Sequence, residues 1–310
     1  VTNRSRASSQ AVADQFNISG VYDNWQELLE DPSIDAICIG TWPYMHRTLT
    51  LAALEAGKHV LCEARMATCA LEAQEMLDAS RERPDLISQI VPSPLTFKID
   101  RLLQGKIAEG YIGDIIGVSV QSLGNAFMDQ GGPMHWRNDR DLSGFNIMNM
   151  GIWYEAMIRW VGRATKVTAM TKVTVNTRKD EDGESVDVNI PDHVGIIAEL
   201  ANGAMANMQF SAVTGLSSGN GVWIYGSEGT LHVDGAQNVY GGRRGDDKLA
   251  EIENPEAGRA YWRVEEEFCS AIRGQEKITR TPFEVGLHYM EFTEAVTRSA
   301  QTGQTVALPL

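Results

Sequence analysis

The 310-residue chain has little cysteine and no long apolar run. Its four cysteines form no Cys-x-x-Cys pair, and their spacing suits neither a zinc site nor a disulfide framework. We therefore expect small buried thiols in a reducing compartment and no bound metal. No stretch reaches the roughly 18–20 apolar residues that a membrane-spanning helix needs, and no secretory signal is visible. These absences favour a cytoplasmic protein without a membrane partner.

Positive charge is scarce as well. The chain has 27 Lys and Arg against 41 Asp and Glu, which gives a formal net charge of −14. An acidic protein repels phosphate backbones, so we expect no nucleic-acid partner. The balance leaves room for a small phosphorylated ligand bound by a local cluster of arginines.

Residues 1–93 alternate helices with short apolar strands. The runs "AICIG" (Ala36–Gly40) and "HVLCE" (His59–Glu63) are typical of strands buried on both faces. Apolar residues at helical spacing predict helices around them, for example over Arg6–Phe16 and Trp25–Glu30. Strands and helices in this alternation predict an α/β domain with a parallel, doubly wound sheet.

Residues 94–310 follow a different pattern, and the boundary is expected near Pro92 to Pro94. Helices are predicted over 97–110, 144–162 and 282–300, and hairpins are predicted to turn at 201–203 and 226–229. The polar run 176–185 is interpreted as a solvated loop. We expect an α+β domain built on a largely antiparallel sheet. One face of that sheet needs to be covered, which favours a homo-oligomer.

Several segments together carry a family resemblance. They are "NRSRASSQAVADQF", "DNWQELLEDPSIDAICIGTWPYMHRTLTLAALEAGKHVLCE", "GYIGD", "IYGSEGTL" and the closing "SAQTGQTVALP". In this order, and over nearly the whole chain, the sequence resembles the glucose–fructose oxidoreductase and inositol dehydrogenase family. The resemblance implies a Rossmann domain that binds NAD(P) and a sheet-based domain that binds substrate and forms oligomers. It also implies hydride transfer between NAD(P) and a sugar, a cyclitol or a related polyhydroxylated compound.

The glycine-rich turn of a Rossmann fold is absent. Such a fold starts with a strand and a Gly-x-Gly-x-x-Gly turn that binds the pyrophosphate at a helix N-terminus. This chain enters the pattern at the second strand, so the first strand is missing. We expect the natural protein to have roughly 30 further N-terminal residues, the length of one βα unit with its turn. If the chain is complete as it stands, its cofactor affinity should be badly impaired.

The start of the chain bears on cofactor choice. The second strand of a Rossmann fold normally ends in an acidic residue that binds the ribose 2′-hydroxyl of NAD. Here the strand end offers Arg4, Ser5 and Arg6 instead. Guanidinium groups pair with a 2′-phosphate, so this end favours NADP, with NAD as the alternative. Arg4 and Arg6 also fit solvated residues at the start of a helix.

The other cofactor contacts are implied by the resemblance. Thr41 to Pro43 stand where the family has a Thr-Pro-Pro segment beside the nicotinamide, and His46 opens the following helix. Glu63 matches the glutamate of the family's Glu-Lys-Pro segment, near the nicotinamide ribose. The implied contacts are Thr41, Trp42, Pro43, His46, Glu63, Ala64 and Arg65. His46 fits equally well a residue that caps the helix or packs beneath the site.

The family's usual proton-transfer residues are missing. Oxidation of an alcohol needs a base, and the family uses the lysine after that glutamate, with an Asp and a His on one helix face. This chain has Ala64 in place of the lysine. Alignment through Gly144 and Gly151 puts Asn149 in place of the Asp and Trp153 in place of the His. None of the three titrates near pH 7.

The loop "GGPMHWRNDRD" offers substitutes. His135 is the candidate base, Arg137 or Arg65 would bind an acidic or hydroxylated substrate, and Asp139 would orient either. Further substrate contacts are expected from Trp136, Asn149, Trp153 and Tyr154. Tyr154 and Glu155 are secondary candidates for the base. The alternative is a packed loop with Trp136 buried and its charges solvated.

Three functions therefore stay open. The first is an NAD(P)-dependent oxidoreductase of a polyhydroxylated compound with a non-standard catalytic set. The second is a catalytically silent protein that binds a dinucleotide and a carbohydrate, since three catalytic positions are lost together. The third is other carbohydrate chemistry with the cofactor as a transient electron carrier, for which the sequence gives no independent support.

Overall fold

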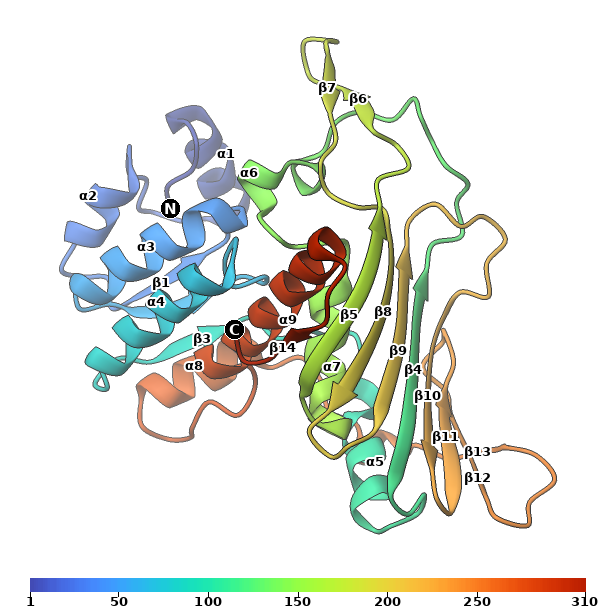
Figure 1. Ribbon diagram of the computed structural model, residues 1–310. Helices are drawn as coiled ribbons and strands as arrows, with labels where there is room; N and C mark the ends of the chain where they lie inside the picture. The colour runs from blue at the N-terminus through green and yellow to red at the C-terminus, as the bar shows by residue number, and fades with distance from the viewer.

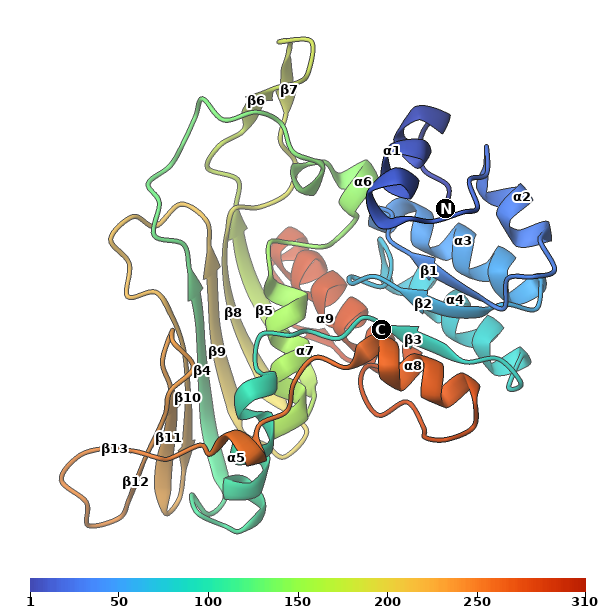
Figure 2. The same ribbon diagram turned by 180° about the vertical axis from the view of Figure 1, so that it is seen from behind.

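The computed structural model describes residues 1–310 as two adjoining units (Figure 1). A small sheet with its helices forms one unit, and a tall nine-stranded sheet forms the far side of the other. α7 (Met150–Val161) and α9 (Phe283–Thr302) lie between the two sheets, and Figure 2 shows the same layering from behind. One main hydrophobic core runs from the small sheet and its helices, past α7 and α9, to the inner face of the large sheet.

The first unit confirms the predicted parallel sheet. Its strands follow the order β1-β2-β3 and are all parallel, with Ala36 opposite His59. α3 begins at Pro43, where the missing N–H costs no helical hydrogen bond, and ends before Gly57 with its φ of +76°. The elements are α1 (Arg6–Phe16), α2 (Trp25–Glu30), β1 (Ala36–Ile39), α3 (Pro43–Glu55), β2 (His59–Cys62), α4 (Ala70–Glu82) and β3 (Ser88–Ile90).

The second unit confirms the predicted, largely antiparallel sheet. The strand order is β13-β12-β11-β10-β4-β9-β8-β5-β14, and only β4 and β9 pair in parallel. The strands are β4 (Ile115–Leu123), β5 (Ala164–Lys172), β8 (His193–Leu200), β9 (Met205–Ser211), β10 (Asn220–Gly226), β11 (Gly229–Val233), β12 (Val239–Arg243), β13 (Ala250–Glu251) and β14 (Val306–Ala307). The remaining helices are α5 (Phe97–Ala108), α6 (Arg140–Ser143) and α8 (Val264–Ile272), with one-turn 3-10 helices at Trp136–Asn138 and Glu256–Gly258.

The large sheet is covered on one face only. On β8 the inward Val194, Ile196 and Ala198 are buried, while Ile197 between them is 56% exposed. Met170 of β5 and Met205 of β9 are exposed on the same outer face. An alternating strand pattern with large apolar residues on both sides leaves an apolar surface on this sheet.

The helix predicted over 144–162 starts later than expected. α7 begins at Met150, and Gly144 ends α6 with a φ of +65°. A Cβ at Gly144 would lie 2.1 Å from the carbonyl oxygen of Thr68, so the two backbones meet there. Apolar residues of the 145–149 turn continue the helical spacing, which is why the sequence pattern hides the break.

Two smaller expectations are wrong. The run 176–185 is not a plain loop but contributes to a hairpin of β6 (Thr177–Lys179) and β7 (Ser185–Asp187). Both of its faces meet solvent, so no apolar alternation marks it. Cys38 is exposed rather than buried, because it faces the opposite side of β1 from the buried Ile37 and Ile39.

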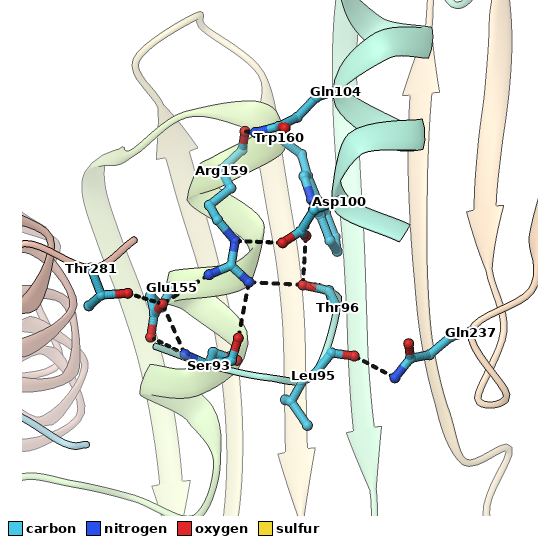
Figure 3. Close-up of polar contacts among 10 residues, drawn as sticks. All are labelled: Ser93, Leu95, Thr96, Asp100, Gln104, Glu155, Arg159, Trp160, Gln237 and Thr281. Carbon is cyan, nitrogen blue, oxygen red and sulfur yellow. Dashed lines mark hydrogen bonds and ion pairs between the residues drawn. The ribbon is translucent and has the colours of Figure 1, made fainter. Parts of the chain in front are cut away.

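A buried polar network fixes the segment between the two units (Figure 3). The Glu155 carboxylate accepts hydrogen bonds from the Ser93 N–H at 3.0 and 3.1 Å and from the Thr281 hydroxyl at 2.7 Å. Arg159 pairs with Glu155 at 2.9 Å and with Asp100 at 3.1 Å. Burial raises the pKa of Glu155, while Arg159 opposes this shift. Glu155, a secondary candidate base from the sequence, is thus engaged in this network.

The end of the chain returns to the first unit. Val264 and Phe268 of α8 pack on Leu61 of β2, and the Ile90 N–H of β3 donates to the Thr281 carbonyl at 3.0 Å. Both ribbon views place α8 beside the small sheet.

The domain boundary near Pro92 to Pro94 stays a prediction. No helix combines the length and apolar character needed to cross a bilayer.

Candidate functional site

The candidate site lies at the carboxyl edge of the small sheet. Residues 41–43 follow β1 and residues 63–65 follow β2, and parallel strands bring both segments to one edge. The buried His46 ring joins them from below. Its Nε2 is 2.8 Å from the Thr41 carbonyl oxygen and its Nδ1 is 2.9 Å from that of Arg65. Burial lowers the pKa of His46, and both ring nitrogens face backbone oxygens, so this histidine holds the site's shape.

A loop of the second unit reaches this edge. Trp136 stacks on Trp42 with ring centroids 5.7 Å apart and planes 17° from parallel. The guanidinium of Arg137 lies 4.1 Å from the Trp136 ring centroid, and that of Arg4 lies 5.5 Å from the Trp42 ring centroid. Three segments far apart in the sequence therefore form a row of alternating cationic and aromatic groups.

His135 sits beside this row. Its ring lies 5.5 Å from that of Trp136, and its Nδ1 accepts a hydrogen bond from the Arg137 N–H at 3.2 Å. Burial, followed by the charge of Arg137, lowers the pKa of His135, so the ring is neutral at pH 7. In the tautomer that accepts this bond, Nε2 carries the proton. For Nε2 to act as a base the proton must move to Nδ1, at a cost of about 1 kcal/mol for the lost hydrogen bond.

Asp139 is placed apart from His135 and Arg137. Its carboxylate caps α6 by accepting the Asp141 N–H at 2.9 Å. No hydrogen bond or ion pair joins Asp139 to either partner expected from the sequence. The structure thus shows Asp139 as the cap of α6, and it shows no contact through which Asp139 could orient His135 or Arg137.

Two of the three substituted positions lie at the start of α7. Asn149 is the N-cap residue of that helix, and its side-chain amide donates to the Ser122 hydroxyl at 2.8 Å. Trp153 is one turn further on and 8% exposed. Ala64 is half-buried in the loop after β2. The Ser122 contact comes from β4, and no local pattern in the sequence indicates it.

Tyr154 lies in the core. Its ring stacks on Phe292 with centroids 3.7 Å apart, and its hydroxyl accepts the Ala164 N–H at 2.9 Å. Burial raises its pKa to about 12. These contacts hold α7 against α9 and β5, so Tyr154 supports the site from within the fold.

The predicted 2′-phosphate residues differ in their surroundings. Ser5 caps α1 and forms a capping box with Ser8. Arg6 pairs with Asp23 at 2.8 Å. Arg4 is exposed and forms no ion pair, and it faces the Trp42 ring. Of the two arginines, Arg4 is the one free to meet a phosphate.

The side chains at this edge of the small sheet include groups that can bind a dinucleotide. Glu63 is exposed and accepts only its neighbour's N–H, from Ala64 at 3.2 Å. Thr41 is exposed and its hydroxyl makes no hydrogen bond, and Arg4 has no anionic partner. A free carboxylate, hydroxyl and guanidinium beside an aromatic face suit ribose, phosphate and a planar ring. The Trp42–Trp136 stack must adjust to admit such a ring between the units.

Two family models match the chain. One, described as an oxidoreductase family with an NAD-binding Rossmann fold, matches residues 1–89, and the other, the GFO/IDH/MocA C-terminal domain, matches residues 101–232. Together they cover more than two thirds of the chain. The chain belongs to the GFO/IDH/MocA oxidoreductase family. The resemblance drawn from the sequence segments is confirmed.

Individual GFO/IDH/MocA relatives are distant. Levoglucosan dehydrogenase of Pseudarthrobacter phenanthrenivorans is 24% identical over an alignment of 235 positions, which covers 71% of this chain and 60% of that protein. D-xylose 1-dehydrogenase (NADP(+)) 2 of Haloferax volcanii is 26% identical over an alignment of 322 positions, which covers 99% of this chain and 91% of that protein. The match thus spans less than two thirds of the first relative's length.

A solved structure shows the same GFO/IDH/MocA architecture. Levoglucosan dehydrogenase in complex with NADH and L-sorbose aligns with a TM-score of 0.87 and 20% identity, over 99% of this chain and 89% of that one. At this identity the match establishes the fold. Residues 1–89, which match the Rossmann model, form the unit whose sheet edge carries Arg4 and Trp42. Trp136 and Arg137 reach this edge from the second unit.

Proposed function

We propose that the protein is an NAD(P)-dependent oxidoreductase of a sugar, cyclitol or related polyhydroxylated compound. The observation that carries the proposal is the stack of Trp136 on Trp42, which brings the second unit's loop to the carboxyl edge of the Rossmann sheet. Levoglucosan dehydrogenase, whose solved complex holds NADH and L-sorbose, has this fold. When bound, a nicotinamide accepts or gives the hydride.

NADP is the proposed cofactor rather than NAD. Arg4 has no anionic partner, and no carboxylate follows it to repel a 2′-phosphate. D-xylose 1-dehydrogenase (NADP(+)) 2, which matches nearly the whole chain, bears NADP in its name. Thr41, Trp42 and Glu63 would meet the nicotinamide half.

The proposed proton acceptor is His135. Its lowered pKa keeps it neutral at physiological pH, and no group of the protein occupies its Nε2. Arg137, two residues on, would hold an oxygen of the substrate. The positions that usually hold the family's catalytic residues are Ala64, Asn149 and Trp153 here. None of them has a titratable side chain that could replace His135 as the base.

A silent binding protein is the second candidate. Asn149 is tied to Ser122 and Trp153 is buried, so two of the three substituted positions have structural roles instead of titrating ones. Such a protein would bind the dinucleotide and a carbohydrate without turnover.

Cofactor titration tests both candidates. The full-length protein is titrated with NADPH and NADH while tryptophan emission is followed, because Trp42 and Trp136 stack at the candidate site. Tight NADPH binding with weaker NADH binding is expected. Binding of neither would refute both candidates.

A turnover screen then separates the two. Sugars, cyclitols and sugar acids are tested with wild type and His135→Ala at 340 nm. Turnover that is lost in the variant supports the oxidoreductase with His135 as base. Cofactor binding without any turnover moves the assignment to the silent protein.

A further inference from the structure

Arg65 is a buried cation without an anionic partner. Its side chain is 4% exposed and makes no ion pair, and its Nε has no hydrogen-bond acceptor. Burial and then the nearby Arg137 lower its pKa to about 10, and no carboxylate opposes them. Removing a guanidinium from water without a counter-charge is unfavourable, so the folded protein carries an uncompensated positive charge here.

The side chain runs along the first turn of α7. A Cβ placed on Gly151 would lie 3.5 Å from Cδ of Arg65, 3.3 Å from Thr293 and 3.7 Å from Tyr289. Gly151 thus lets the arginine approach the helix backbone closely.

That turn of α7 also offers free donors. The N–H groups of Gly151 and Ile152 have no acceptor in the chain. Asn149 does not cap them, because its amide is directed to Ser122. The N-terminus of this 12-residue helix therefore carries unsatisfied N–H groups and the positive end of the helix dipole.

A second guanidinium completes the cluster. Arg137, from the loop that carries Trp136, is close enough to shift Arg65 and has no carboxylate partner of its own. In a protein of net charge −14, the buried, unpaired Arg65 lies along an uncapped helix N-terminus, and the exposed, unpaired Arg137 is near enough to lower its pKa. Such an arrangement suits an anion.

We propose that Arg65, Arg137 and the first turn of α7 bind a carboxylate of the substrate. The inference rests on the proposed function and narrows the substrate from polyhydroxylated compounds in general to their acids. A planar carboxylate accepts two parallel N–H donors from a guanidinium. A tetrahedral phosphate is the other source of oxyanions that such donors bind.

Thermal unfolding with paired ligands tests the site. Gluconate, glucuronate and acetate are compared with their neutral counterparts sorbitol, glucose and acetamide, in the presence and absence of NADPH, and glucose 6-phosphate serves as the phosphate probe. At least one acid should raise the Tm more than its neutral counterpart does. Equal shifts for every pair, or a shift with glucose 6-phosphate alone, would overturn the inference.

Arg65→Met supplies the matched variant, and Arg244→Met, at an exposed pair with Glu228, is the control. Arg65→Met should raise the Tm of the ligand-free protein, because an unpaired buried charge is removed. It should weaken acid binding about 10- to 100-fold, as expected for loss of a charged hydrogen-bond partner. An unchanged acid-induced shift in Arg65→Met contradicts the assignment.

A separate measurement distinguishes this failure from failure of the proposed function. NADPH binding by wild type is measured first. Binding of NADPH together with indifference to every acid refutes the carboxylate site alone. Absence of NADPH binding refutes the proposed function itself.

Discussion

The indole of Trp136 stacks on that of Trp42 with their centroids 5.7 Å apart, and this pair joins the loop of one unit to the strand edge of the other. The two residues are 94 positions apart, so no local sequence pattern reports the contact. Each ring also carries a guanidinium, Arg4 on Trp42 and Arg137 on Trp136.

A double-mutant cycle measures this stack. Trp42→Ala, Trp136→Ala and the double variant are unfolded in urea, and the coupling energy should be about 0.5–1.5 kcal/mol. The cofactor should reduce the coupling, because a ring entering the cleft separates the pair. Additive effects of the two substitutions would show that the stack contributes nothing to stability.

Arg4 and Arg6 should differ in their effect on NADPH. Arg4→Ala removes the unpaired guanidinium and should raise the Kd for NADPH about tenfold, with little change for NADH. Arg6→Ala should do less, because Arg6 is already paired with Asp23 at 2.8 Å. Fluorescence titration of both variants checks this. Equal losses for NADPH and NADH in Arg4→Ala would argue against 2′-phosphate recognition.

The pH profile should report His135. Its pKa is lowered by burial and by Arg137, so the neutral base is present above a value that lies below the ordinary 6.5. kcat/KM for alcohol oxidation should fall as the pH drops through that value. Arg137→Gln removes a repelling charge and should move this acid limb to higher pH. A limb that stays in His135→Gln belongs to another group.

The outer face of the large sheet should mediate self-association. Met170, Ile197 and Met205 are 82%, 56% and 62% exposed on neighbouring strands. Ile197→Lys places a charge in this apolar face and should shift a dimer or larger assembly toward monomer in light scattering with size-exclusion chromatography. Leu71→Lys, at an exposed helix position outside the sheet, is the matched control. A monomeric wild type would exclude the interface.

The sequence predicts most of the fold because local patterns carry it. Arg6–Phe16 and Trp25–Glu30 are helices with the bounds that their spacing indicates, and Asn202-Gly203 turns the β8–β9 hairpin. The break before α7 is not visible, because Gly144 is required by Thr68, which is distant in the chain.

The site is less predictable for the same reason. Residue types point to Arg65, His135 and Arg137 as candidates, but their burial and partners come from tertiary contacts. Asp139 was expected to orient a neighbour, yet a local capping bond satisfies it. Arg65 is buried beside Gly151 and Tyr289, and no regular spacing in the sequence relates these two residues to it.

The network of Glu155, Arg159 and Asp100 has a consequence for ligand entry (Figure 3). It anchors the connecting segment at Ser93 and Thr96 to α7 through buried bonds, which leave that segment little freedom to act as a hinge between the units. Moving the long loop that carries Trp136 costs less free energy, because its residues 125–135 form no helix or strand. We therefore expect ligand entry to displace the Trp136 loop while the connecting segment stays in place.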